Sequence, residues 1–157
     1  MILTTHILSG ALVGAEIKNP YEIAGLAIIL HFLLDLLPHG DYLNKKSSLK
    51  DFWKVGIDLL IGFLLIAAIV FHRKETLVDI LYLQNISIGI FFSLLPDGLT
   101  FLYWKMGMKF LKPIYNFHQK LHLAPDFSPK RQFRLKNNLW DILISLISLI
   151  TLMSLLR

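Results

Sequence analysis

Residues 20–38 read PYEIAGLAIILHFLLDLLP, an apolar run that begins and ends at a proline. Proline suits the first turn of a helix and is common just beyond its last turn, so this stretch predicts one helix over 20–38. His31 and Asp35 fall in the last two turns of that helix, among apolar neighbours. Ionisable groups buried in such a segment are costly, which makes them candidates for a functional site.

Four further apolar segments predict helices over residues 3–17, 50–71, 76–95 and 139–156, the fourth helix stopping at Pro96. Of the 157 residues, 55% are hydrophobic and only 17% are charged, whereas soluble domains carry about 25% charged residues. A chain this short could not bury so much apolar surface. We therefore expect a single all-α domain, 1–157: a polytopic membrane bundle of four or five helices. The segment 3–17 is short for a span of about 20 residues.

A short internal repeat refines this expectation. The sequence HILSG at 6–10 is similar to DLLIG at 58–62, and LLPHG at 36–40 is similar to LLPDG at 94–98. The repeat predicts two pseudo-repeated helical hairpins followed by a C-terminal helix. Residues 1–3 lack the basic start of a signal peptide, so the first helix is expected to be retained.

The basic residues predict the orientation in the membrane. Twelve of the 16 Lys and Arg residues fall in the loops after the second and fourth predicted helices. The positive-inside rule places these loops in the cytoplasm, including a basic segment over 105–137 with a short interfacial helix near 114–122. Because topology accounts for the net charge of +5, we expect no nucleic-acid partner.

Histidines and carboxylates gather at the same predicted cytoplasmic face. His31 and Asp35 are four residues apart, as are His118 and His122, so each pair shares one helix face. The chain has no cysteine, and a site of imidazole and carboxylate suits zinc, with manganese or iron as alternatives. Such an ion could activate water for attack on a phosphoester. The predicted ligands are His6, His31, Asp35, Asp58, His118 and His122, with Asp97 or Asp41 supporting a ligand or acting as general base.

Structural interpretations of the same residues remain open. Asp41, Asp97 and Asp141 lie at predicted helix boundaries, where Asp is a common cap. A buried Asp–His cluster, with or without metal, could simply tie helices together in a non-enzymatic scaffold or regulator. A small ion transporter would need polar residues across the bilayer, and the outer halves of the first four helices offer little beyond residues 84, 85 and 87.

Several of these motifs resemble a known family. Thr5-His6 with Gly10, followed by a His-x-x-x-Asp helix that ends in LLPHGD at 36–41, is similar to the bacterial inner-membrane proteins known as membrane-bound metal-dependent hydrolases. That family is distantly similar to zinc-dependent phospholipase C. The resemblance covers roughly residues 1–100 and implies site roles for His6, His31, Asp35, His39, Asp41 and Asp58, which adds His39 to the metal ligands.

The resemblance, the charge pattern and the metal chemistry together lead to an expected location and substrate. The family commonly has Pro-Asp-x-Asp-His after its second helix, where this chain has Pro38-His39-Gly40-Asp41-Tyr42. The expected protein is a multi-pass inner-membrane hydrolase whose site faces the cytoplasm. Its expected substrate is a membrane lipid or a lipid-like phosphoester, such as an isoprenoid phosphate.

Overall fold

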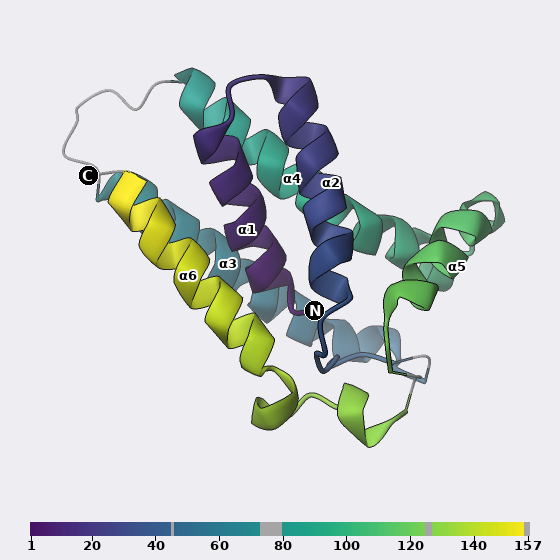
Figure 1. Ribbon diagram of the computed structural model, residues 1–157. Coiled ribbons are helices and arrows are strands. Elements are labelled where there is room, and N and C mark those ends of the chain that lie inside the picture. Colours follow the sequence, from purple (N-terminus) through teal and green to yellow (C-terminus); the bar gives the residue numbers. More distant parts are fainter. Residues whose placement is uncertain (45, 73–79, 125–126, 156–157) are drawn as a thin grey trace.

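The computed structural model describes residues 1–44, 46–72, 80–124 and 127–155 and is all-helical (Figure 1). The described residues form six α-helices and no strand. The helices are α1 (Leu3–Glu16), α2 (Pro20–Asp35), α3 (Trp53–Phe71), α4 (Ile80–Met106), α5 (Lys112–Leu121) and α6 (Leu139–Leu155). The predicted all-α class is therefore confirmed, with the short helix α5 lying where an interfacial helix was expected.

Helix α1 lies at the centre of the bundle. It packs most extensively against α4 and also contacts α2, α3 and α6 (Figure 1). Glycines allow the close approach to α4: a Cβ atom on Gly10 would overlap the carbonyl of Gly89, and one on Gly89 would overlap the carbonyl of Gly10. The short first helix is thus a core helix, shielded on several sides by longer ones.

Helix α2 begins as the sequence predicts and ends slightly earlier. The side chain of Asn19 accepts a hydrogen bond from the backbone of Tyr21, and Pro20 occupies the first turn. The helix stops at Asp35 rather than at Pro38. Proline disfavours helical backbone at the residue before it, and the chain here turns before Pro38 is reached. Asp35 therefore lies at the very end of the helix, next to the loop that carries His39.

Helix α4 contradicts the expected stop at Pro96. It continues through the proline to Met106, with Pro96 buried inside it. A proline removes one backbone hydrogen bond, and a helix held by packing on both sides can tolerate that loss. As a consequence Asp97 lies within a helix and does not cap one, and Thr100 follows on the same helix. The expected first residues of this helix, 76–79, lie outside the described residues.

The predicted pairing of hairpins is not what organises the bundle. Helices α1 and α2 do pack together, but α3 and α4 make few contacts with each other in the described residues. Each of these two helices packs instead on α1. The internal repeat therefore predicts similar turns in the chain, not a repeated packing unit.

Two helical stretches are long and apolar enough to cross a membrane, namely Leu49–Phe71 and Ile80–Met106. Helix α6 is apolar but shorter. Large apolar side chains are exposed along α3 and α6, for example Leu64 and Ile150 at 58% and 65%. These exposed apolar side chains fit a lipid environment, because proteins that are stable in water rarely gather many of them on one surface.

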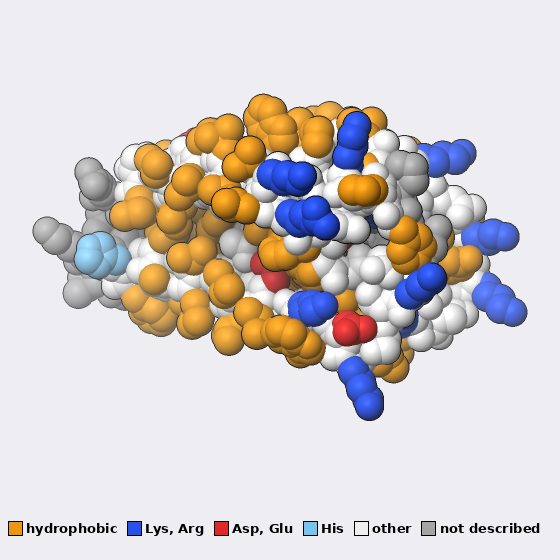
Figure 2. Space-filling model, turned by 90° about the horizontal axis from the view of Figure 1, so that it is seen from below, with side chains coloured by type: hydrophobic (Ala, Val, Ile, Leu, Met, Phe, Trp, Pro, Cys, Tyr) orange, Lys and Arg blue, Asp and Glu red, His pale blue; other side chains and the backbone are white. Residues whose placement is uncertain are grey.

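The basic loops come together at one end of the bundle, as the charge pattern predicts. Arg131 donates from Nε to Asp41 Oδ2 at 2.6 Å, and Lys105 donates from Nζ to the carbonyl of Ser47 at 2.6 Å. Figure 2, seen from below, shows Lys and Arg side chains concentrated over one part of this end, beside a largely apolar surface. Lys45, one of the basic residues counted above, lies outside the described residues.

Candidate metal centre

Two carboxylates from other helices hold the start of α1. Asp58 of α3 accepts hydrogen bonds from the backbone of Leu3 at 2.6 Å and of Thr4 at 3.1 Å, and also from the Thr4 hydroxyl at 2.6 Å. Asp141 of α6 accepts from the backbone of Ile2 at 2.8 Å. Carboxylates satisfy the free N–H groups of a helix start and interact favourably with its dipole. The start of α1, and therefore His6 in its first turn, has a defined position.

These hydrogen bonds give Asp58 a different role from the other predicted ligands. Both of its oxygens are occupied, since Tyr42 adds a hydroxyl hydrogen bond to Oδ2 at 2.8 Å. Asp58 thus has the contacts of a helix cap supplied from another helix, and it belongs to neither of the two His/Asp groups described next.

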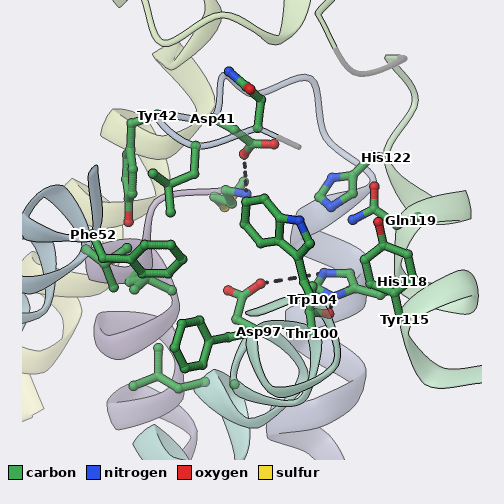
Figure 3. A pocket seen from close by; sticks show the side chains of 18 of the residues that line it. Asp41, Tyr42, Phe52, Asp97, Thr100, Trp104, Tyr115, His118, Gln119 and His122 are labelled. Atoms are coloured by element: carbon green, nitrogen blue, oxygen red, sulfur yellow. Dashed lines mark hydrogen bonds and ion pairs between the residues drawn. The ribbon is translucent and has the colours of Figure 1, made fainter. Parts of the chain in front are cut away.

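Four side chains from three helices form a first cluster. His31 and Asp35 come from α2, Asp97 from α4 and His118 from α5, and one potential ligand atom from each lies within 4.8 Å of the others. The Nε2 atom of His118 is 2.6 Å from Asp35 Oδ2. The same atom is 3.8 Å from Asp97 Oδ1, a pair marked by a dashed line in Figure 3. His31 Nε2 lies 3.3 Å from the same Asp35 oxygen. His31, Asp35 and His118 are buried, and Asp97 borders a cavity.

In His31 and in His118, the ring nitrogen Nδ1, which does not face the cluster, contacts an oxygen of α4. His31 Nδ1 lies 2.7 Å from the carbonyl oxygen of Ser93, which can only accept, so this nitrogen carries the proton. His118 Nδ1 lies 2.8 Å from the hydroxyl of Thr100. Metal-binding histidines are typically oriented by such contacts on the nitrogen that does not face the metal. In a neutral His31, Nε2 therefore presents its lone pair to the cluster.

His6 lies directly beside this first cluster, and neither of its ring nitrogens has a hydrogen-bond partner in the described residues. Its ring stacks on His31 with centroids 4.1 Å apart, and its Nε2 lies 3.3 Å from Asp35 Oδ1. The residue is fully buried, and within the described chain neither ring nitrogen makes a hydrogen bond. Buried polar atoms are nearly always paired, so an unpaired imidazole here is consistent with a bound ion or water.

A second cluster shares Asp35 with the first. His39, from the loop after α2, and His122, at the end of α5, each present a ligand atom within 4.8 Å of Asp35 and of each other. His39 Nδ1 is 2.7 Å from the Leu37 carbonyl, while its Nε2 and the Nδ1 of His122 are buried without a hydrogen-bond partner in the described residues. Asp35 could therefore join two neighbouring ion sites.

The protonation states of His39 and His122 favour the binding of a metal ion. Burial lowers the pKa of His122 to about 3, because the attraction of Asp35 is too small to compensate. Burial and the nearby Met1 ammonium also lower the pKa of His39. Both imidazoles are then neutral at physiological pH, which is the form that binds metal.

His118 differs from these two. Burial alone would lower its pKa, but the hydrogen bond to Asp35 and the charge of Asp97 outweigh burial and hold the pKa of His118 above the usual value. The raised pKa of His118 favours its protonated form, which pairs with Asp35 in the metal-free chain. A divalent ion would replace that proton, so metal binding and deprotonation of His118 are coupled.

Asp41 lies beside the clusters and belongs to neither. It pairs with Arg131, and its Oδ1 is 3.5 Å from His39 Nε2. Burial would raise the pKa of Asp41, but the Met1 ammonium, His39 and Arg131 outweigh it and lower the pKa, so the carboxyl is ionised at neutral pH. Of the two predicted catalytic carboxylates, Asp97 lies within the first cluster and Asp41 remains at its edge.

A cavity of about 480 Å³ adjoins both clusters. His118, His122 and Asp97 form part of its wall, and Figure 3 shows them across the cavity from Tyr42 and Asp41. The remaining wall is largely apolar and aromatic and includes Phe52, Phe101, Trp104 and Tyr115. Both clusters are therefore accessible, through this cavity, to a small molecule that has an apolar part.

Sequence reasoning missed several residues that shape this centre. The amino group of Met1 lies 3.1 Å from Asp35 Oδ1 and is buried. Ser93 and Thr100 orient the two histidines of the first cluster through contacts that no short motif signals. Only the turn-by-turn positions of α4 relative to α2 and α5 bring them there.

No family model matches this chain, and no significant similarity to a curated protein or to a solved structure is found. Functional inference therefore rests on the geometry of the clusters and of the cavity.

Proposed function

We propose that this chain is a membrane-embedded, metal-dependent hydrolase of a phosphoester. The observation that carries the proposal is the first cluster: two imidazoles and two carboxylates within 4.8 Å, contributed by three helices and open to a cavity. The resemblance in the motifs around His6 and in the helix that carries His31 and Asp35 points to the same class of enzyme.

The donor set suits a borderline divalent ion such as zinc, with manganese or iron as alternatives. His31, Asp35, Asp97 and His118 would hold one ion, and Asp35, His39 and His122 a second. His6, stacked on His31, would join or support the first group. Such an ion supplies Lewis-acid activation of water and of a phosphoryl oxygen.

The remaining polar groups supply positioning and proton transfer. Arg131 lines the cavity and is held by Asp41 at 2.6 Å, where its guanidinium can bind a phosphate oxygen. Asp41 and Asp97 both line the same cavity, and either carboxylate can accept a proton from attacking water, Asp97 only when it does not bind the ion. The aromatic wall around Trp104 and Tyr115 would exclude bulk water from the reaction.

We propose a multi-pass location in the inner membrane with the site facing the cytoplasm. Two helices long enough to span, the apolar α6 and the exposed apolar surface support membrane insertion. The gathering of basic loops around the clusters supports a cytoplasmic site, because cytoplasmic loops are enriched in Lys and Arg.

Metal content tests this function directly. Protein purified in mild detergent without chelator is expected to contain at least one equivalent of zinc, manganese or iron by elemental analysis. His31→Ala and Asp35→Ala should lose it, whereas His72→Ala, which removes a histidine outside both clusters, should not. Metal-loaded wild type should hydrolyse a phosphoester and chelated protein should not. A folded wild type that binds no metal would refute the proposal.

A non-enzymatic scaffold or regulator is the second candidate, and one observation favours it. Asp35 already pairs with His118 and with the Met1 amino group, so the cluster can tie α2 to α5 without any metal. If the cluster is only structural, Asp35→Ala should unfold the protein and metal should change neither stability nor activity. A catalytic centre predicts instead that wild type binds metal and hydrolyses a phosphoester only with metal bound, and that Asp35→Ala protein that remains folded is inactive.

A further inference from the structure

A second cavity, of about 710 Å³, lies beside the first. It runs between the start of α3 and the segment 127–133, and the two cavities share residues 41–44 and Arg131. Its volume is within the range of about 300–1,000 Å³ that is typical of small-molecule sites. The proposed reaction does not by itself require this space.

The walls of the second cavity are apolar and face outward. Trp53, Ile57 and Ile61 line it from α3, and Phe127 and Phe133 line it from the opposite segment. Trp53 is 62% exposed and Phe133 is 57% exposed. Ile57 and Ile61 are also exposed apolar residues of Leu49–Phe71, the more apolar of the two stretches that could cross a membrane. The cavity is therefore continuous with the surface that would contact lipid chains.

Charged residues lie where the two cavities meet. Arg131, paired with Asp41, forms part of the walls of both cavities, and Lys54 and Asp58 line the second one. An anionic group bound at Arg131 would lie at the junction, with His118 and His122 on one side of it and the apolar walls on the other. This polarity, charged at the inner end and apolar towards the lipid-facing surface, matches an amphiphile and not a soluble metabolite.

We propose that the second cavity binds the hydrocarbon chain of an anionic lipid phosphoester whose phosphate is held at Arg131. For cleavage this inference rests on the proposed hydrolase function, because it places the scissile ester in the first cavity. Chain binding itself requires neither metal nor catalysis. Substrate selection then depends on chain length, and short-chain phosphates are poor ligands.

Trp53 provides a direct probe of this binding. In a variant that retains only this tryptophan (Trp104→Phe, Trp140→Phe), a twelve-carbon alkyl phosphate brominated along its chain should quench Trp53 fluorescence saturably. Unlabelled dodecyl phosphate should compete, whereas butyl phosphate and a neutral dodecyl glycoside should not. The matched control retains only Trp140, which is 45% exposed on α6 and lines neither cavity. It should show weak, non-saturating quenching.

Two further variants, with one control, test the apolar wall of the second cavity and the positive charge of Arg131. Ile57→Asn should weaken binding of the alkyl phosphate by about tenfold, the effect of losing much of one branched apolar contact. Ile147→Asn, an equally apolar and exposed position on α6, should leave binding unchanged. Arg131→Gln should weaken alkyl phosphate binding and remove the preference over the neutral glycoside.

The outcomes separate this inference from the hydrolase proposal. Equal, non-saturating quenching of Trp53 and Trp140, or equal competition by butyl phosphate, would overturn chain binding even if metal and activity on a soluble phosphoester were found. Saturable binding that persists in chelated protein and in His31→Ala would support chain binding even if no metal or hydrolysis were detected.

Discussion

The Nε2 atom of His118 lies 2.6 Å from Oδ2 of Asp35, although 83 residues separate them in the chain. This contact joins the end of α2 to α5 and is the shortest link in the first cluster. Because burial makes an unpaired charge at Asp35 costly, the position must hold a cation: protonated His118, the Met1 ammonium or a metal ion. The predictions below separate these contributions.

Replacing Asp35 should remove both metal and stability. Asp35→Ala leaves His118 buried without its carboxylate, and breaking a buried pair in this way costs about 3–5 kcal/mol. Thermal unfolding in detergent, combined with elemental analysis, would measure both effects. Glu22→Gln, at the exposed start of the same helix, should change stability by less than about 0.5 kcal/mol. An Asp35 variant that keeps its metal would contradict the assigned ligand set.

Thr100 should tune metal affinity without touching the metal. Thr100→Val keeps the shape of the side chain but removes the hydroxyl that contacts His118 Nδ1 at 2.8 Å. Loss of such an orienting contact typically lowers metal affinity by about 10–100-fold. Competition with a chelating dye would measure the change. Thr151→Val, which removes a hydroxyl hydrogen bond within α6, serves as the control and should leave metal affinity unaltered.

Asp58 should behave as a helix cap and not as a ligand. Asp58→Asn weakens the hydrogen bonds to the start of α1, and loss of a capping group costs about 0.5–2 kcal/mol. Metal stoichiometry should stay at the wild-type value while the unfolding temperature falls. Loss of metal from a variant that remains folded would show instead that Asp58 belongs to the centre.

Acidification should destabilise the metal-free protein through His122. Its pKa is about 3 when folded, against an ordinary value near 6.5, so below pH 6.5 the unfolded chain binds a proton that the folded chain does not. The His122 contribution to stability is present above pH 6.5 and is lost as the pH falls towards 3. The expected slope is up to about 1.4 kcal/mol per pH unit. Denaturant unfolding of chelated protein between pH 4 and 8 would measure it.

Two variants identify the residue responsible for that slope. His122→Asn should make the acid limb shallower without abolishing it, because His39, whose pKa is also lowered, contributes with the same sign. His118→Asn should leave the slope of the acid limb largely unchanged but remove a loss of stability above pH 6.5, because the pKa of His118 is raised and its stabilisation is present below pH 6.5 and lost as the pH rises through its folded pKa. An acid limb unchanged in His122→Asn would contradict the burial of a neutral imidazole there.

The contact between α1 and α4 should be intolerant of even one methyl group. Gly10→Ala places a Cβ atom against the Gly89 carbonyl, and overpacking of this kind costs about 1–3 kcal/mol. Gly25→Ala and Gly56→Ala meet no atom within 4 Å and should be neutral or stabilising. Unfolding temperatures of the three variants would test the central position of α1.

Much of the centre was predictable from local pattern. His31 and Asp35 stand out as ionisable groups in an apolar helix, and the four-residue spacing of His118 and His122 predicts one shared face. The path of α4 was not predictable from the rule that Pro96 ends a helix, because α4 packs against α1, α2 and α5 and continues through the proline. The same local rule therefore placed Asp97 at a cap, whereas it lies in the first cluster.

The sequence by itself determined the all-α class, the apolar stretches and the end of the bundle at which histidines, carboxylates and basic loops gather. These properties depend on hydropathy, helical period and charge, which are local. Only the tertiary structure decided that α1 is the central helix, that Asp58 caps it, and that Asp35 joins His31 and His118. Such pairings depend on how helices far apart in the chain pack, and the glycine contact between α1 and α4 sets that packing.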